Sequence, residues 1–147
     1  MKSLFAILTL VTSLCYSADK VVEPGIYTAV DVDSSTITAT LNMRANKTVN
    51  LVIKAPDFEM PAEGCEGTYE VTENLMAAHM VCPIEGFEKM DVTIDIAPVT
   101  PESVRSLQGV VVDVIFGAFG EEPAKFVLRK IQYLFSLLKN IFFIHKS

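Results

Sequence analysis

The sequence predicts an all-β fold, an antiparallel barrel or sandwich of about eight strands followed by a C-terminal amphipathic helix. Apolar and polar residues alternate with the period of two that strands require in several separate segments. Turn-forming residues divide these segments into short pieces, and no helical pattern lies between them before residue 131. Parallel neighbours would need long, usually helical crossovers, so we expect antiparallel pairing.

The N-terminus has the three parts of a secretory signal peptide, which we place at residues 1–18. Lys2 supplies the positive charge, Leu4–Leu14 is mainly apolar, and small residues precede the expected cleavage after Ala18. The alternative is a membrane anchor, but the apolar run is too short to span about 30 Å of hydrocarbon. We therefore expect a secreted, extracellular protein whose β-domain occupies residues 19–130.

The clearest strand pattern is Thr36–Arg44, followed by a second strand from Thr48 to Lys54. The apolar face of the first consists of Ile37, Ala39, Leu41 and Met43, and that of the second of Val49, Leu51 and Ile53. Arg44–Lys47 is a polar link of hairpin length between them. A slip of one residue would move every aliphatic side chain into water, so the register is well specified.

Other strand segments show the same period less clearly. Alternation recurs from Ile26 to Asp33, around Tyr69 and Val71, and at Val92, Ile94 and Ile96, and Phe126–Lys130 forms a short last strand. Leu75–Cys82 and Val110–Phe116 are almost continuous apolar runs. We expect them to be strands covered on both faces.

Two segments between the strands have a different character. Pro56–Gly67 is rich in proline, glycine and acidic residues, and we expect a loop there. In Pro98–Gln108, Thr100 is suited to be an N-cap and Pro101 to be the first helical residue, which predicts a single helical turn.

Residues 131–147 change to a helical period. Apolar residues recur three and four positions apart at Ile131, Leu134, Phe135, Leu138, Ile141 and Phe142. Such a helix either packs across the domain or contacts a membrane or a protein partner. It is too short and too polar to span a bilayer.

Two modification sites follow from the sequence. Cys65 and Cys82 remain after cleavage, and an even pair in an oxidising compartment predicts a disulfide. A loop of that length contributes roughly 3 kcal/mol in the chain-entropy treatment. Asn46-Lys47-Thr48 is an N-glycosylation sequon at an expected hairpin tip, so we expect a glycoprotein.

Composition and motifs argue against several classes of function. The formal net charge is −6 and there is no basic run, which disfavours nucleic acid and anionic membranes as partners. The sequence has no metal-ligand spacing, phosphate-binding loop or nucleophile elbow, and His79 lies among apolar residues as an ordinary strand histidine. We expect no enzymatic activity, no metal and no cofactor.

The order of elements resembles that of the calycin group, the lipocalin-type barrels. The resemblance rests on Gly25-Ile26-Tyr27 at the first strand and on Arg129 at the end of the last strand. In lipocalins a GxW motif and a basic residue pack together at the closed end of the barrel. The resemblance therefore implies that Gly25, Tyr27 and Arg129 close the barrel here, with tyrosine in place of tryptophan.

These features support two hypotheses of function. The first is a secreted, lipid-carrier-like barrel that binds a small apolar ligand. Its expected lining residues are Ile37, Leu41, Met43, Leu51, Ile53, Tyr69, Val71, Val92 and Ile94. The second is a disulfide-stapled β-sandwich that serves as an interaction or adhesion module and binds no small molecule. Its contact surfaces would be the acidic loop 56–67 or the C-terminal helix, since a small closed sheet often fills its own interior.

Overall fold

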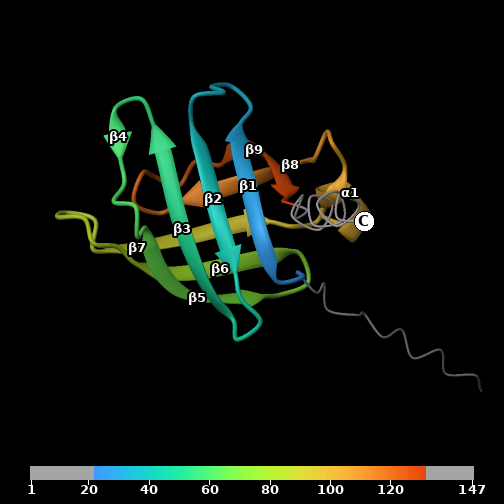
Figure 1. Cartoon of the computed structure of the whole chain (residues 1–147), viewed down its shortest axis with the longest axis horizontal. Helices are drawn as coiled ribbons and strands as arrows, with labels where there is room; N and C mark the ends of the chain where they lie inside the picture. The colour runs from blue at the N-terminus through green and yellow to red at the C-terminus, as the bar shows by residue number, and fades with distance from the viewer. Residues whose placement is uncertain (1–21, 132–147) are drawn as a thin grey trace, which may run out of the picture.

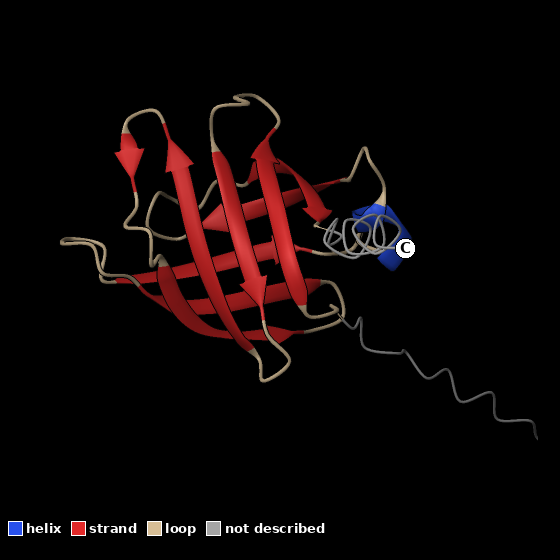
Figure 2. Cartoon of the chain, in the orientation of Figure 1, coloured by secondary structure: helices blue, strands red, loops and turns tan. Residues whose placement is uncertain are grey.

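A computed structural model of the chain describes residues 22–131, which form nine β-strands and one short helix (Figures 1 and 2). The elements are β1 (Gly25–Asp31), β2 (Thr38–Met43), β3 (Thr48–Ala55), β4 (Phe58–Glu59), β5 (Cys65–Val71), β6 (Leu75–Val81), β7 (Lys89–Asp95), α1 (Pro101–Arg105), β8 (Val110–Phe116) and β9 (Ala124–Lys130). The expected signal peptide lies outside the described residues, as does the expected C-terminal helix except for Ile131, which is not helical.

Eight of the strands close into an antiparallel barrel. Strands adjacent in sequence pair with one another, apart from β4 and β5, which do not pair. Strand β3 pairs instead with β5, and the pairing of β9 with β1 closes the ring. Strand β2 pairs with both β1 and β3, so the ring has no free edge along these strands. The structure therefore selects a barrel rather than a sandwich, and β4 is an additional strand paired with the end of β3.

The hairpin of β2 and β3 confirms the strongest sequence prediction. Leu41 lies opposite Leu51, and both point into the barrel, as do Val49 and Ile53. Strand β1 follows the same rule with Tyr27 inward. The core is apolar because each strand contributes alternate side chains to one shared interior. Its larger members besides these are Met43, Met60, Tyr69, Met76, Met80, Met90, Val92, Ile94, Ile96, Val104, Val112, Val114, Phe126 and Leu128.

Two strands expected to be covered on both faces are covered on only one. In β6, Met76 and Met80 are buried, whereas Leu75 and Val81 are exposed. In β8 the outward Val111 is likewise exposed. The expectation was wrong because a closed single sheet has only one interior. None of residues 22–131 fully covers the outer faces of β6 and β8.

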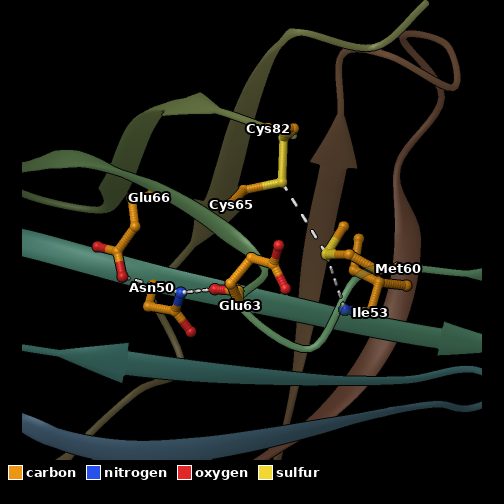
Figure 3. The surroundings of a disulfide bond; sticks show 7 residues. All are labelled: Asn50, Ile53, Met60, Glu63, Cys65, Glu66 and Cys82. Atoms are coloured by element: carbon orange, nitrogen blue, oxygen red, sulfur yellow. Dashed lines mark hydrogen bonds between the residues drawn. A yellow bond between two sulfur atoms is a disulfide. The ribbon is translucent and has the colours of Figure 1, made fainter. Parts of the chain in front are cut away.

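The expected loop 56–67 is also partly wrong, since it contains β4 and the first three residues of β5. It forms a seam in the barrel wall, where the last two residues of β3 pair with β4 and only the first four pair with β5. The Cys65–Cys82 disulfide joins β5 to the end of β6 beside this seam, which confirms the predicted pairing (Figure 3). Buried Met60 fills the seam, with its sulfur 3.4 Å from the amide nitrogen of Ile53.

Polar contacts fasten the same seam from outside. The Asn50 side-chain amide donates to the Glu63 carbonyl and to the Glu66 carboxylate (Figure 3). Arg44 forms an ion pair with Glu66 at 2.9 Å, and its hydrogen bond lowers the pKa of the Glu66 carboxyl. Both partners are largely exposed, so we expect the pair to contribute little to stability.

Helix α1 confirms the predicted helical turn and lies at one end of the barrel (Figures 1 and 2). The Thr100 hydroxyl accepts the Ser103 amide, and the Ser103 hydroxyl accepts the Thr100 amide, so two donors at the helix start are satisfied. Val104 is the buried residue of this helix. We call this the closed end of the barrel.

Glu23 ties the elements of the closed end together. Its carboxylate contacts Arg105 of α1 and lies 2.9 Å from the ammonium of Lys130 on β9. The hydrogen bond from Lys130 lowers the pKa of Glu23. The Tyr27 hydroxyl donates to the Glu23 carbonyl at 2.6 Å, so the chain before β1 is held against the barrel.

The basic residue over Tyr27 differs from the one that the lipocalin resemblance implied. Lys130 lies 5.8 Å from the centre of the Tyr27 ring, whereas Arg129 is exposed and donates to the Gln108 carbonyl. Strand alternation explains the difference, because Arg129 follows the buried Leu128 and points outward. A Cβ atom on Gly25 would lie 2.7 Å from the Lys130 side chain, so this glycine allows the lysine to reach over the ring.

Within residues 22–131, no helix has the length and apolar character needed to cross a membrane.

Candidate functional site: an apolar cavity at the barrel mouth

The end of the barrel opposite α1 is formed by four connections. They are the β1–β2 loop, the β3–β4 turn, the β6–β7 loop and the β8–β9 loop. The first two lie at the top of the barrel in Figure 1. We call this end the mouth.

A cavity of about 290 Å³ lies inside the mouth. Its lining residues come from β1, β2, β3, β4, β8, β9 and two of the loops, and they are Asp31, Ile37, Ala39, Ile53, Ala55, Phe58, Phe116, Phe119, Ala124 and Phe126. All but Asp31 are apolar. The three alanines leave room where larger side chains would fill the interior, and this is why the barrel is hollow at this end.

Five phenylalanines form one connected group at the cavity, which we call the phenylalanine cluster: Phe58, Phe87, Phe116, Phe119 and Phe126. Phe126 is buried and contacts Phe116 edge-on, with ring centres 5.7 Å apart. Phe119 lies 5.9 Å from Phe58 and 5.7 Å from Phe87. The cluster therefore runs from the barrel interior to the rim of the mouth.

The outer members of the cluster are open to solvent. Phe119 is 57% exposed and Phe87 is 37% exposed, although both make ring contacts. Because Phe119 also lines the cavity, the cavity reaches the surface at this ring. Exposed aromatic rings at the entrance of an apolar cavity are typical of a binding site.

Asp31 is the charged residue at the rim of a cavity whose lining surface is almost wholly apolar. Tyr27, Ala29 and Asp31 share one side of β1, and the first two are buried. One carboxylate oxygen of Asp31 accepts the backbone amides of Asp33 and Ser34, at 2.7 and 3.2 Å. Asp31 thus both caps the β1–β2 loop and borders the cavity.

The half of the barrel near α1 is almost filled. Among residues 22–131, the void found there measures about 20 Å³ and is lined by Val22, Tyr27, Leu41, Met43, Met76, Ile94, Ile96, Val99 and Leu128. A void of this size holds at most about one water molecule. The same barrel is therefore a packed core at one end and a hollow site at the other.

The residues expected to line a ligand cavity are divided between these two regions. Ile37 and Ile53 line the mouth cavity, and Leu41, Met43 and Ile94 border the small void. Leu51, Tyr69 and Val92 are buried and Val71 is half-buried, and none of the four lines either space.

Sequence reasoning did not find the phenylalanine cluster. Phe87 and Phe119 lie in loops, where strand periodicity carries no signal, and Phe58 lies in a segment expected to be loop. The available signal was the occurrence of large apolar residues in otherwise acidic loops. Such residues in loops point to contact with a core or a ligand.

The other sequence-predicted sites lie away from the cavity. Asn46 is exposed in the β2–β3 turn, where its side-chain oxygen accepts the amide and the hydroxyl of Thr48. His79 is on the outer wall, 2.7 Å from Asp91 on β7. Among residues 22–131, no three His, Cys, Asp or Glu side chains are grouped as metal ligands would be.

A second hollow of about 370 Å³ lies beside the disulfide on the wall and is lined by Glu63, Gly64, Glu66, Val81, Cys82 and Pro83. It lacks the aromatic lining of the mouth cavity. We therefore treat the mouth cavity as the candidate functional site.

No family model matches the chain, and no curated protein sequence or solved structure shows significant similarity to it.

Proposed function

We propose that this chain is a secreted, non-enzymatic binding protein that holds a small apolar ligand in the mouth cavity. The observation that carries the proposal is an apolar space of about 290 Å³ that opens to solvent beside the half-exposed ring of Phe119. Eight-stranded barrels have interiors just wide enough to be filled by side chains or to hold one small ligand. Here the alanines at the mouth leave that space unfilled.

The volume favours a compact ligand over a long lipid. Ligand pockets usually measure roughly 300–1,000 Å³, and benzene binds in an engineered apolar cavity of about 150 Å³. A space of about 290 Å³ suits a single-ring or short branched molecule. The near absence of empty volume toward α1 also leaves a long chain no room to extend.

The chemistry of the lining favours an apolar body. Transfer of apolar surface from water contributes about 25 cal/mol per Å². Aromatic walls add edge-on and stacked contacts, since Phe116, Phe119 and Phe126 are already arranged around the space.

Secretion is the part of the proposal that rests on the sequence. It is supported by the signal-peptide pattern of residues 1–18 and by the Cys65–Cys82 disulfide, a bond that persists in oxidising compartments. The lipocalin-like order of elements is a further reason to favour a carrier, although the cation over Tyr27 is a lysine.

The alternative of a ligand-free interaction module has less support. In such a protein the hollow mouth would be an unfilled void, and voids lined by apolar groups lower stability. The exposed rings of Phe87 and Phe119 would also be left in water without a role.

Two measurements test the proposal. Native mass spectrometry of protein purified from its own source should reveal a retained small molecule. Calorimetric titration with 2-phenylethanol, a neutral probe of suitable size, should give saturable binding and a raised melting temperature.

Ala124→Leu supplies the variant test, because it fills the cavity from β9. We expect it to weaken 2-phenylethanol binding by at least about tenfold. Ala55→Leu, which fills the cavity from β3, guards against misfolding of a single variant. Ala77→Leu adds the same group on the outer face of β6 and should leave binding unchanged. Absence of both a retained molecule and probe binding would refute the proposal.

A further inference from the structure

We propose that the mouth cavity selects ligands that join a compact apolar body to a protonated amine, and that it rejects carboxylates such as fatty acids. This inference rests on the proposed function and deepens it by naming the ligand class. It is carried by the charges of the mouth loops, by Asp31 at the cavity and by the exposed phenylalanine rings.

The loops of the mouth carry acidic side chains and no lysine, arginine or histidine. Their acidic residues are Asp33, Asp57, Glu85, Glu88, Glu121 and Glu122. The lysines at nearby strand ends, Lys54, Lys89 and Lys125, each adjoin an inward residue and so point to the outer wall. Lys125 pairs with Asp113 there and also interacts with the charge of Asp33, so five of the six loop acids keep the mouth negative. A mouth of one charge sign concentrates ions of the opposite sign, so cations are favoured at the entrance.

Asp31 brings this negative charge to the rim of the cavity, whose lining surface is otherwise almost wholly apolar. It is the one charged residue among those that line the space, and no basic residue lines it. Its Oδ1 atom is engaged by two backbone amides of the β1–β2 loop, which fixes the carboxyl group in place. A ligand ammonium at the rim would meet a positioned carboxylate, whereas a ligand carboxylate would meet a like charge.

The rings at the rim supply a second attraction for the same head group. The rings of Phe58 on β4 and Phe87 in the β6–β7 loop each lie within 6 Å of the ring of Phe119 in the β8–β9 loop. The face of an aromatic ring is electron-rich and attracts ammonium groups, and several rings around a cation form the aromatic cages that bind amines. Phe116 and Phe126 lie deeper and would contact the apolar body.

Three matched probes test the inference by NMR titration of the full secreted chain: 2-phenylethylamine, 2-phenylethanol and 3-phenylpropanoate. They share a phenylethyl body and differ in the head group. We expect the amine to bind about five- to tenfold more tightly than the alcohol, and the carboxylate more weakly than both. Raising the salt concentration should weaken amine binding and leave alcohol binding unchanged.

Asp31→Asn isolates the charge. Asparagine keeps a side-chain oxygen that can accept the amides of Asp33 and Ser34, so the loop cap is retained. We expect the preference for amine over alcohol to fall by about threefold or more while alcohol binding persists. Glu70→Gln removes one charge from the outer face of β5 and should leave the preference intact.

Phe119→Leu isolates the ring. Leucine keeps an apolar side chain at the rim without an aromatic face, so amine binding should weaken more than alcohol binding. Each outcome has a distinct meaning. If the carboxylate binds as tightly as the amine, or if Asp31→Asn leaves the preference unchanged, the amine inference is wrong and the proposed function stands. If none of the three probes binds, the amine inference is wrong, and the proposed function is wrong as well if protein from its own source retains no small molecule.

Discussion

Tyr27 has two structural roles at the closed end. Its ring belongs to the barrel core, and its hydroxyl reaches the Glu23 carbonyl at 2.6 Å. Burial raises the pKa of Tyr27 to about 12, and the negative charge of Glu23 adds to the shift. The folded state therefore holds the neutral phenol at a pH where an unfolded chain would lose the proton.

The first prediction concerns Tyr27→Phe. At pH 7 the variant should be less stable by about 1 kcal/mol, because it lacks the hydrogen bond to Glu23. Above pH 10 the unfolded wild type ionises its phenol while folded Tyr27 keeps its proton. The contribution of Tyr27 to wild-type stability is thus fully present below pH 10. It falls by roughly 2–3 kcal/mol as the pH rises toward about 12.

The measurement is urea unfolding of both proteins from pH 7 to pH 12. Burial also raises the pKa of Tyr69, but that contribution is common to both proteins and cancels in the difference. The stability difference should shrink and then change sign as the pH rises. A difference that stays constant to pH 12 would show that Tyr27 titrates normally.

The β2–β3 hairpin shows what the sequence predicts well at the scale of elements. In both strands each inward residue is small or aliphatic, and most outward residues are polar, so one register buries the apolar set. The start of the helix at Thr100 and Pro101 was equally predictable from the sequence, because the capping hydroxyl and the proline are local signals.

The second prediction tests this alternation with neighbouring residues of β2. Leu41→Ala should lower the free energy of unfolding by about 2–5 kcal/mol. It removes a buried side chain and leaves a cavity that the surrounding residues fill only in part. Thr40→Ala, one position away and exposed, should change it by less than about 1 kcal/mol. Denaturant titration of both variants provides the comparison, and equal losses would contradict the inward placement of Leu41.

Elements whose position depends on closure were less predictable. The runs in β6 and β8 carry apolar residues on both faces, and sequence alone does not tell a doubly covered strand from one with valine or leucine facing water. Whether Lys130 or Arg129 lies over the Tyr27 ring depends on which residues of β9 point inward. The pairing of β9 with β1, a long-range contact, decides this.

At the scale of the whole molecule, the barrel divides into a filled end and a hollow end. The end near α1 is packed by Tyr27, Leu128 and two methionines, Met43 and Met76, and alanines leave the mouth open. The phenylalanine cluster exists only because closure brings β4, the β6–β7 loop and the β8–β9 loop together. For this reason the sequence indicated an apolar interior, but only two of the nine expected lining residues, Ile37 and Ile53, line the mouth cavity.

The same division explains how one small domain can be both stable and able to bind. Core packing at the closed end and the disulfide at the seam hold the wall. The mouth loops can then carry exposed rings and charges without being needed for closure. Filling the mouth with Ala124→Leu should accordingly leave the protein folded while it abolishes most of the probe binding.

The most direct test of ligand binding at the mouth is an NMR titration of the isoleucine δ1 methyl groups with 2-phenylethanol. Ile37 and Ile53 line the mouth cavity, whereas Ile94 and Ile96 border the filled end. We expect saturable shifts at Ile37 and Ile53, with Ile94 and Ile96 nearly unchanged. Saturable shifts confined to Ile94 and Ile96, or no saturable shift at any of the four, would contradict a binding site at the mouth.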